Sequence, residues 1–273
     1  MGHVIHPSAS IESEIDCPDV VVGEGVRIGR SVRIKVTERL RIGAFGVVGD
    51  GAEISGRDVE IGQELWMNPG ARIGGGSCFE AQSLFWAGDF LHLGQDVFVN
   101  TARPVRLGDE VGLGTRTALY THGAYLSALD GFPVAFGPIE IGSRAWLPGA
   151  IVNPGVTIGD DVVIGVNSLV TRDIPSGSLA AGSPAVVLRP NAYPQPLDGS
   201  ALADFWADFL EAAPVKGEAS GHLLCVDQTI FDTANQRIDG PAGEDTERMR
   251  NQLRRYGIRF RYRPRNGRYE PWA

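Results

Sequence analysis

A repeat of six residues organises most of this sequence. Aliphatic or aromatic residues recur six apart in runs separated by short slips, often with a glycine directly after them. A period of six matches neither the turn of an α-helix nor the simple alternation of a strand, and such periodicity is typical of repeat folds. The series comprises Val22, Ile28, Ile34, Ile42, Val48, Ile54, Ile61, Met67, Ile73, Phe79, Phe85, Leu93, Val99, Leu107, Leu113, Leu119, Ile141, Leu147, Ile158, Ile164 and Val170.

Each group of six is predicted to form a short strand and a corner. The residue four places after the aliphatic one, as in Val26, Val32, Ala52 and Ala71, is small or apolar and should also point inward. The glycines suit corners with a tight or left-handed backbone. Stacked groups would bury a continuous apolar ladder, which predicts an all-β solenoid over roughly residues 20–172. Because the open sides of a solenoid need neighbours or caps, we also expect an oligomer.

The composition narrows the classes of partner. With a formal net charge of −8 over 273 residues, the chain lacks the excess of Lys and Arg by which general nucleic-acid binders neutralise phosphate. No apolar run is long enough for a transmembrane helix, so we expect no membrane span. Cys17, Cys78 and Cys225 lie far apart and form no Cys-x-x-Cys pair. This spacing favours reduced thiols and a cytoplasmic location over a disulfide framework or a thiolate metal site.

The last groups of the repeat carry a more specific pattern. It consists of Trp-Leu-Pro-Gly-Ala at 146–150, Asn-Pro-Gly-Val-Thr-Ile-Gly-Asp at 153–160, Ser-Leu-Val-Thr-Arg-Asp-Ile-Pro at 168–175 and Ala-Gly-Ser-Pro-Ala at 181–185. These segments resemble the closing coils of the hexapeptide-repeat acyltransferases, which include galactoside, maltose and xenobiotic O-acetyltransferases. The resemblance covers roughly residues 20–190. It implies a left-handed parallel β-helix, a homotrimer with active sites between subunits, and acetyl-CoA as the acyl donor.

The repeat is interrupted at residues 120–138, a segment that begins Tyr-Thr-His-Gly. An insertion that leaves a rigid solenoid is suited to form a lid or a binding loop. His122 lies at its mouth, and acyl transfer from a thioester to a hydroxyl needs a base such as histidine, which titrates near neutral pH. The resembling enzymes carry their catalytic histidine at this position, so we predict that His122 is the general base.

The resemblance also implies substrate-binding residues. Asn100 would hydrogen-bond the acceptor hydroxyl; the alternative is an asparagine that tolerates a left-handed corner. Trp146 would pack against the pantetheine arm, and the Gly149 N–H would point at the reacting carbonyl oxygen. Two arginines would lie near the nucleotide phosphates. The full donor-binding set is Trp146, Gly149, Val166, Thr171, Arg172 and Arg189.

Other functions remain open at the level of sequence. The acceptor could be a hydroxyl of a sugar or saccharide, which we favour, or the amine of an amino-sugar nucleotide. A γ-carbonic-anhydrase-like enzyme needs three histidine ligands, and no second histidine lies within a few residues of His122, so we expect no metal. A non-catalytic binding protein would have no need of the CoA-type motif.

A different composition follows Pro190. We therefore expect an acyltransferase domain at 1–190 and a small α+β extension at 191–273, with helices near 200–213 and 244–256. The extension is rich in arginine, which suggests either a patch for an anionic glycan, nucleotide-sugar or acidic lipid, or a solvated face. These arginines are Arg248, Arg250, Arg254, Arg255, Arg259, Arg261, Arg263, Arg265 and Arg268.

Overall fold

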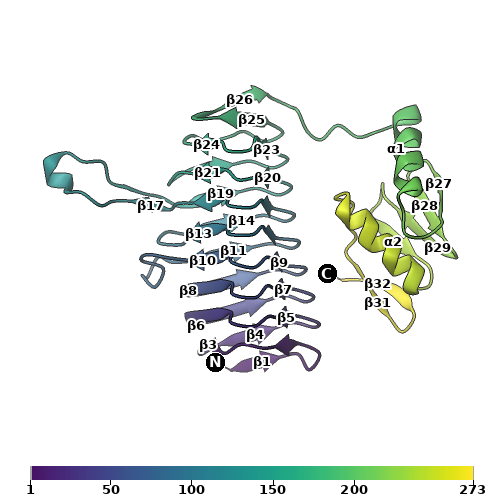
Figure 1. Cartoon of the computed structure of the whole chain (residues 1–273), viewed down its shortest axis with the longest axis horizontal. Coiled ribbons are helices and arrows are strands. Elements are labelled where there is room, and N and C mark those ends of the chain that lie inside the picture. The colour runs from purple at the N-terminus through teal and green to yellow at the C-terminus, as the bar shows by residue number, and fades with distance from the viewer. Residues whose placement is uncertain (1, 273) are drawn as a thin grey trace. The chain divides into compact units, whose positions relative to one another are not determined.

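The structure, a computed structural model, describes residues 2–272. The chain divides into two compact units, Met1–Pro194 and Gln195–Ala273. The first unit consists of short strands stacked in parallel, coil upon coil, as Figure 1 shows. The predicted all-β solenoid is therefore confirmed.

Each coil of the solenoid contributes one strand to each of three faces. The first face contains β1 (His3–Ile5), β4 (Val20–Val22), β6 (Arg33–Ile42), β8 (Glu53–Ile61), β11 (Phe85–Ala87), β14 (Val105–Leu107), β19 (Ile139–Ile141) and β22 (Thr157–Ile158). The second face contains β2 (Ser10–Ile11), β5 (Arg27–Ile28), β7 (Val47–Val48), β9 (Trp66–Met67), β12 (His92–Leu93), β15 (Gly112–Leu113), β20 (Trp146–Leu147), β23 (Val163–Ile164) and β25 (Leu179–Gly182).

The third face contains β3 (Ile15–Asp16), β10 (Arg72–Gly74), β13 (Phe98–Asn100), β16 (Ala118–Leu119), β21 (Ile151–Val152) and β24 (Leu169–Val170). The long strands β6 and β8 turn from the third face into the first, so these two faces form one continuous 14-stranded sheet. The antiparallel strand β26 (Ala185–Arg189) pairs with β25 and closes the last coil.

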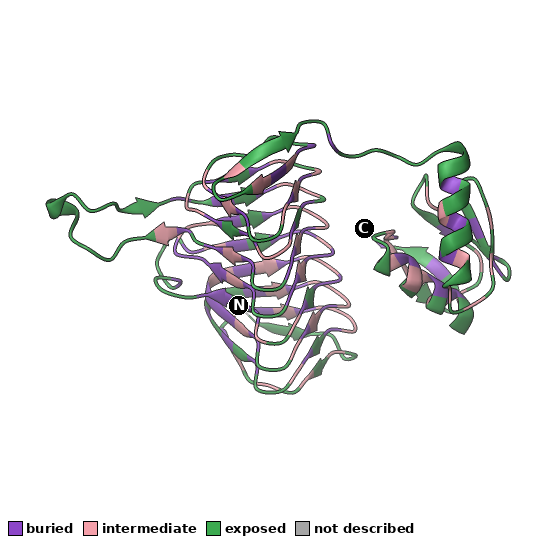
Figure 2. Ribbon diagram, turned by 45° about the horizontal axis from the view of Figure 1, so that its top comes forward, coloured by how far each residue is buried: buried purple, intermediate pink, exposed green. Residues whose placement is uncertain are grey.

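The interior of the solenoid is filled by the predicted ladder of apolar residues. Nearly every residue of the six-residue series is buried, as are the predicted inward residues four places on, Val26, Val32, Ala52 and Ala71. Figure 2 shows this buried interior within an exposed outer surface. The prediction is wrong for Phe79, which is exposed because residues 75–84 leave the coil as a loop between β10 and β11.

The glycines after the aliphatic residues are needed for close packing between coils. A Cβ on Gly43 would lie 2.6 Å from the carbonyl carbon of Gly62 in the next coil, so no side chain fits there. The left-handed residues of these corners come two positions later, as at Phe45 and Glu64. The prediction of a tight backbone is confirmed, whereas the expected left-handed conformation at these glycines is wrong.

Side-chain oxygens join successive coils at the corner between the first and second faces. Asp89 Oδ1 accepts the Gln63 N–H at 2.7 Å, and Asp109 Oδ1 accepts the Asp89 N–H at 2.8 Å. Ser143 and Asp160 continue the same pattern in the following coils. These bonds pair corner N–H groups that have no strand partner, and they hold the vertical register.

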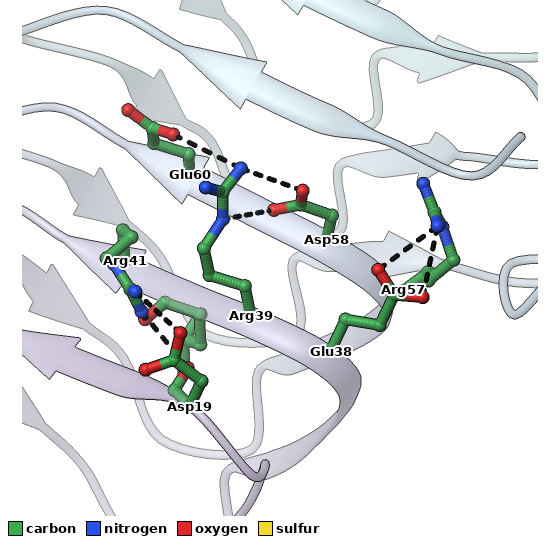
Figure 3. A network of polar contacts seen from close by, with 8 residues as sticks. Asp19, Glu38, Arg39, Arg41, Arg57, Asp58 and Glu60 are labelled. Carbon is green, nitrogen blue, oxygen red and sulfur yellow. Dashed lines mark hydrogen bonds and ion pairs between the residues drawn. The ribbon is translucent and has the colours of Figure 1, made fainter. Parts of the chain in front are cut away.

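Ion pairs perform a similar role on the outside of the first coils. Figure 3 shows Arg39 bonded to Asp58 across β6 and β8, and Arg41 bonded to Asp19 on the other side. Arg57 and Glu38 pair where β8 and β6 turn from the third face into the first. Pairs of this exposure add little to the free energy of unfolding, but they favour one register of neighbouring strands.

One segment of the solenoid projects outward as an arm. It begins with β17 (His122–Gly123), which pairs in antiparallel fashion with β18 (Ala135–Phe136), and its tip holds a short 3₁₀ helix, Ala128–Asp130. The arm extends away from the coils in Figure 1. It occupies the interruption seen in the sequence at 120–138.

The second unit is small and mixes helices with antiparallel strands. It contains α1 (Gly199–Glu211), α2 (Glu244–Arg255), the sheet of β27 (Glu218–Ser220), β28 (Leu223–Val226), β29 (Thr229–Asp232) and β30 (Arg237–Asp239), and the hairpin of β31 (Tyr262–Arg265) and β32 (Arg268–Pro271). The predicted α+β extension is confirmed. Several of its arginines bind neighbouring carboxylates, among them Arg248 with Glu244 and Arg250 with Glu247. Neither helix is long and apolar enough to cross a membrane.

Candidate active site

His122 and Asn100 meet at the corner where the arm leaves the solenoid. Asn100 ends β13 on the third face, and His122 begins β17 just past the neighbouring strand β16. The Nδ1 atom of His122 lies 2.9 Å from Oδ1 of Asn100. Asn100 is 1% exposed, so this hydrogen bond is shielded from water on the asparagine side.

The hydrogen bonds around Asn100 define which way its amide points. Its Nδ2 donates to the carbonyl oxygen of Gly76 at 3.1 Å, while its Oδ1 accepts from the Thr121 hydroxyl at 2.6 Å and the Ala102 N–H at 3.3 Å. An amide oxygen can only accept, so the Nδ1 atom of His122 must carry the proton in this arrangement. The Nε2 atom then keeps its lone pair, which is what a general base requires.

Two further contacts hold the imidazole. The ring stacks on Phe136 of β18 at a centroid distance of 5.7 Å and an interplanar angle of 15°. The Arg103 guanidinium covers the same Phe136 ring at 4.5 Å and binds Glu80 at 3.3 Å. The ring is therefore fixed both by a hydrogen bond at Nδ1 and by packing against the base of the arm.

The Nε2 side of His122 faces the loop at residues 75–84. A Cβ added to Gly76 would lie 3.9 Å from Nε2 and 3.8 Å from Cε1. The Gly76 backbone thus borders the approach to the lone pair without closing it. A side chain larger than alanine at this position would extend into the space next to Nε2.

The contacts of Asn100 favour a role different from the expected one. Each polar atom of its amide is bonded within the protein, to Gly76, Thr121, Ala102 and His122. Direct binding of an acceptor hydroxyl would have to displace one of these partners. In this structure Asn100 holds the imidazole of His122 through the contact at Nδ1.

Trp146 lies on the outer surface of the second face, in β20. It is 43% exposed, and its ring lies against the backbone of Gly112 in the coil below. A Cβ on Gly112 would come within 2.8 Å of Cζ3 of the indole. The absence of a side chain at Gly112 therefore allows the indole to lie flat and to present an apolar surface.

The remaining residues of the predicted donor set lie around the last coils. The Gly149 N–H, expected to face a carbonyl oxygen, donates instead to Thr117 Oγ1 at 3.0 Å. Val166 is 69% exposed and follows β23, and Thr171 and Arg172 follow β24. Arg189 ends β26 and is exposed. No hydrogen bond or ring contact joins any of these residues, or Trp146, to His122 within residues 2–272.

Four neighbours of His122 were missed by the sequence reasoning: Thr121, Gly76, Arg103 and Phe136. Thr121 is adjacent to His122 in sequence, which is a weak signal. The other three lie 46, 19 and 14 residues from it, and the six-residue pattern holds no sign that they approach the imidazole.

The structure is a β-solenoid with a histidine at the corner where the arm leaves it, and relatives of this chain identify its family. A galactoside O-acetyltransferase of Escherichia coli is 33% identical over 142 residues, which cover 48% of this chain and 70% of that protein. The chain therefore belongs to the hexapeptide-repeat acetyltransferase family, and its enzyme class is acetyltransferase.

Three further comparisons complete the picture of what the chain is similar to. A relative from Staphylococcus aureus is 44% identical over 107 residues, and the chain spans 53% of its length. A hexapeptide-repeat acetyltransferase from Vibrio cholerae, solved with acetyl-CoA, aligns at 25% identity and a TM-score of 0.39, covering 55% of this chain and 70% of that one. Comparison with protein-family profiles finds no match for the chain.

Proposed function

We propose that this protein transfers an acetyl group from acetyl-CoA to a hydroxyl of a sugar or saccharide, with His122 as the general base. The observation that carries the proposal is the 2.9 Å contact between His122 Nδ1 and Asn100 Oδ1. This bond assigns the proton to Nδ1 and leaves Nε2 free to accept a proton. Sequence kinship with galactoside O-acetyltransferase supports the reaction class and the acceptor class.

The reaction proceeds by direct transfer within a ternary complex. His122 Nε2 removes the proton of the acceptor hydroxyl as its oxygen attacks the thioester carbonyl carbon. The tetrahedral intermediate collapses, the C–S bond breaks, and the leaving thiolate of CoA takes the proton back from Nε2. Asn100 stabilises the protonated imidazole through its contact with Nδ1. The products are an O-acetylated saccharide and free CoA.

The donor site that we propose uses the exposed surface of the last coils. The indole of Trp146 and the side chain of Val166 offer apolar contact to the pantetheine arm, and Thr171 lines it. The guanidinium groups of Arg172 and Arg189 are suited to the phosphates of the nucleotide. Because the Gly149 N–H is bonded to Thr117, we assign Gly149 a structural role in positioning this corner.

We further propose that the active site is completed in a homotrimer. Within residues 2–272 no hydrogen bond or ring contact joins the donor residues to His122, which is the expected arrangement if a second subunit supplies them. The arm supports this idea, because its tip exposes large apolar side chains to an unusual degree, 97% at Tyr125 and 98% at Leu129. Exposed apolar surface of this kind is suited to contact a second copy of the chain.

We propose that the domain at 1–190 carries the catalytic activity and that the protein acts in the cytoplasm. The free Cys17, Cys78 and Cys225 would stay reduced there.

The proposal is tested by measuring thiol release from acetyl-CoA with a panel of saccharides, using the whole protein and His122→Ala. His222→Ala is the matched control, because His222 lies in the second unit, where its ring contacts the Thr233 hydroxyl. We expect turnover with at least one saccharide, a loss of about 10²–10⁴ in kcat for His122→Ala, and no change for His222→Ala. Mass measurement in solution should give three chains.

Two results would overturn the proposal. If acetyl-CoA is neither bound nor consumed, the donor assignment is wrong. If His122→Ala retains full activity while the acetyl-CoA is consumed, the base is another residue. Acetylation of an amino sugar at nitrogen, with no reaction of hydroxyls, would replace the acceptor class and leave the base assignment intact.

A further inference from the structure

Three cations stack on aromatic rings around the His122 site. Arg72 lies 5.2 Å from the Phe98 ring, Lys35 5.8 Å from the Phe79 ring, and Arg103 4.5 Å from the Phe136 ring. The three rings belong to β13, to the loop at 75–84 and to β18. Phe79 lies in the same loop as Gly76, and Phe136 stacks on the ring of His122.

A continuous surface runs from Arg72 to the proposed base. Arg72 covers the Phe98 ring, and the edge of that ring lies against Gly75, where an added Cβ would come within 2.8 Å of Cζ. The next residue, Gly76, borders Nε2 of His122. The Tyr120 ring, which is exposed, meets Phe98 edge to face at 5.7 Å. An acceptor placed at Nε2 would therefore extend over Phe98 and Tyr120 towards Arg72.

The charge of this surface is not neutralised by the protein. Arg72 and Lys35 make no ion pair within the described part of the chain, whereas Glu53, opposite Arg72 in the strand register, is bonded to Arg33 at 2.6 Å. Arg103 is paired with Glu80. Two exposed cations of the third face thus have no ion-pair partner among the described residues, in a protein whose net charge is −8.

We propose that the acceptor is an acidic saccharide, whose carboxylate binds Arg72 while its sugar ring packs on Phe98 and Tyr120. This inference rests on the proposed O-acetyltransferase function and specifies its substrate class. The planar guanidinium donates two parallel hydrogen bonds to a carboxylate, and the Phe98 ring beneath it holds the group in place. Lys35, further along the same face, adds a second positive charge for a neighbouring acidic residue of the saccharide.

The test compares acceptors that differ in charge alone. Oligomers of galacturonic acid and of N-acetylneuraminic acid are assayed beside their methyl esters, which keep every hydroxyl and lose the carboxylate charge. We expect kcat/KM to be at least about tenfold higher for one of the acids than for its ester, the size of effect expected for one charge-assisted hydrogen bond. Added salt should reduce the difference.

Variants of Arg72 test whether this residue causes the preference for the acid over its ester. Arg72→Gln should raise KM for the acid about tenfold, leave kcat and the KM of acetyl-CoA unchanged, and remove the preference over the ester. Arg72→Lys should restore part of the preference. The matched control is Arg27→Gln, an exposed strand arginine on the second face.

The outcomes separate this inference from the proposed function. Equal rates with acids and esters, or a preference for the esters, would overturn the acidic acceptor while His122-dependent acetylation stands. A rise in the KM of acetyl-CoA in Arg72→Gln would assign Arg72 to the donor phosphates instead. If no saccharide is acetylated at all, it is the proposed function that fails.

Discussion

The Oδ1 atom of Asn100 and the Nδ1 atom of His122 lie 2.9 Å apart, although 22 residues separate them in the sequence. They meet because β13 and β16 are neighbouring strands of the third face, with Phe98 opposite Ala118 in the register. Asn100 ends one coil and His122 begins the arm from the next. The contact joins a buried amide to Nδ1, whereas Nε2 is the nitrogen that we propose as the base.

Removing the Asn100 amide should slow catalysis more than it weakens binding. In Asn100→Ala we expect kcat to fall on the order of tenfold to a hundredfold, as is common when a residue that orients a histidine is lost, with little change in the KM of the acceptor. In Asn100→Asp the acid limb of the pH–rate profile should move to higher pH, because the added negative charge favours the protonated imidazole. Steady-state kinetics between about pH 5 and about pH 9 measure both effects.

Asn68→Ala serves as the control for the loss of an asparagine hydrogen bond, since the half-buried Asn68 donates from Nδ2 to the Leu93 carbonyl oxygen, away from the site. A rise in acceptor KM without a fall in kcat in Asn100→Ala would instead show that Asn100 binds the acceptor directly.

A larger side chain at position 76 should weaken binding of the acceptor and leave binding of acetyl-CoA unchanged. Gly76→Ala places a methyl group in ordinary contact with the imidazole, 3.8 Å from Cε1, and should keep most of the activity. Gly76→Val extends further and should raise the KM of the acceptor about tenfold or more. The alanine variant is the matched control, and equal kinetics for the two variants would contradict the proposed approach to Nε2.

A methyl group at Gly112 should displace the indole of Trp146. Gly112→Ala would place Cβ inside the contact distance of the ring, so the indole must tilt away from the sheet. If Trp146 binds the donor, the KM of acetyl-CoA should rise about tenfold in both Gly112→Ala and Trp146→Ala. The double variant should resemble Trp146→Ala, because without the ring there is no clash; additive effects would refute the coupling.

The ion pair between Asp19 and Arg41 should contribute to stability above mildly acidic pH. The hydrogen bond from Arg41, 2.8 Å to Asp19 Oδ2, lowers the pKa of Asp19. A carboxyl with a lowered pKa in the folded state stabilises the protein above its ordinary pKa of about 3.9, and this contribution is lost as the pH falls through the lowered value.

Thermal unfolding from neutral pH down to about pH 3 tests this sign. Asp19→Asn should unfold at a slightly lower temperature than the unchanged protein at neutral pH, and the two should converge in acid. Asp16→Asn, at an exposed position of β3, is the control. A difference that grows as the pH falls would contradict the prediction.

The six-residue period predicted most of the fold because it records a local rule. Residues such as Val26 and Ile28 must fill the interior of every coil, so burial is written into their spacing. Phe79 is the exception: it keeps the six-residue spacing but lies in the loop between β10 and β11, so it is exposed and the spacing predicts burial only for residues inside a coil. The role of the corner glycines also depended on a neighbour, since Gly43 is confined by Gly62 in the next coil.

The candidate site was predictable at His122, which stands at the break in the repeat, but its surroundings were not. Gly76 and Phe136 approach the imidazole from a loop and from the return strand of the arm. Nothing in their residue types or spacing distinguishes them from other loop residues. The hydrogen bond that commits the Gly149 N–H to Thr117 was equally invisible, because it joins two coils.

The sequence alone determined the solenoid, its interruption and the position of His122, because each depends on residues near one another along the chain. The tertiary structure decided the rest: the contact between Asn100 and the Nδ1 atom of His122, and the cluster of Arg72, Phe98 and Tyr120. The physical reason is that coils of unequal length are brought into register by stacking. Contacts across that stack follow from the length of every loop in between, and no local pattern records them.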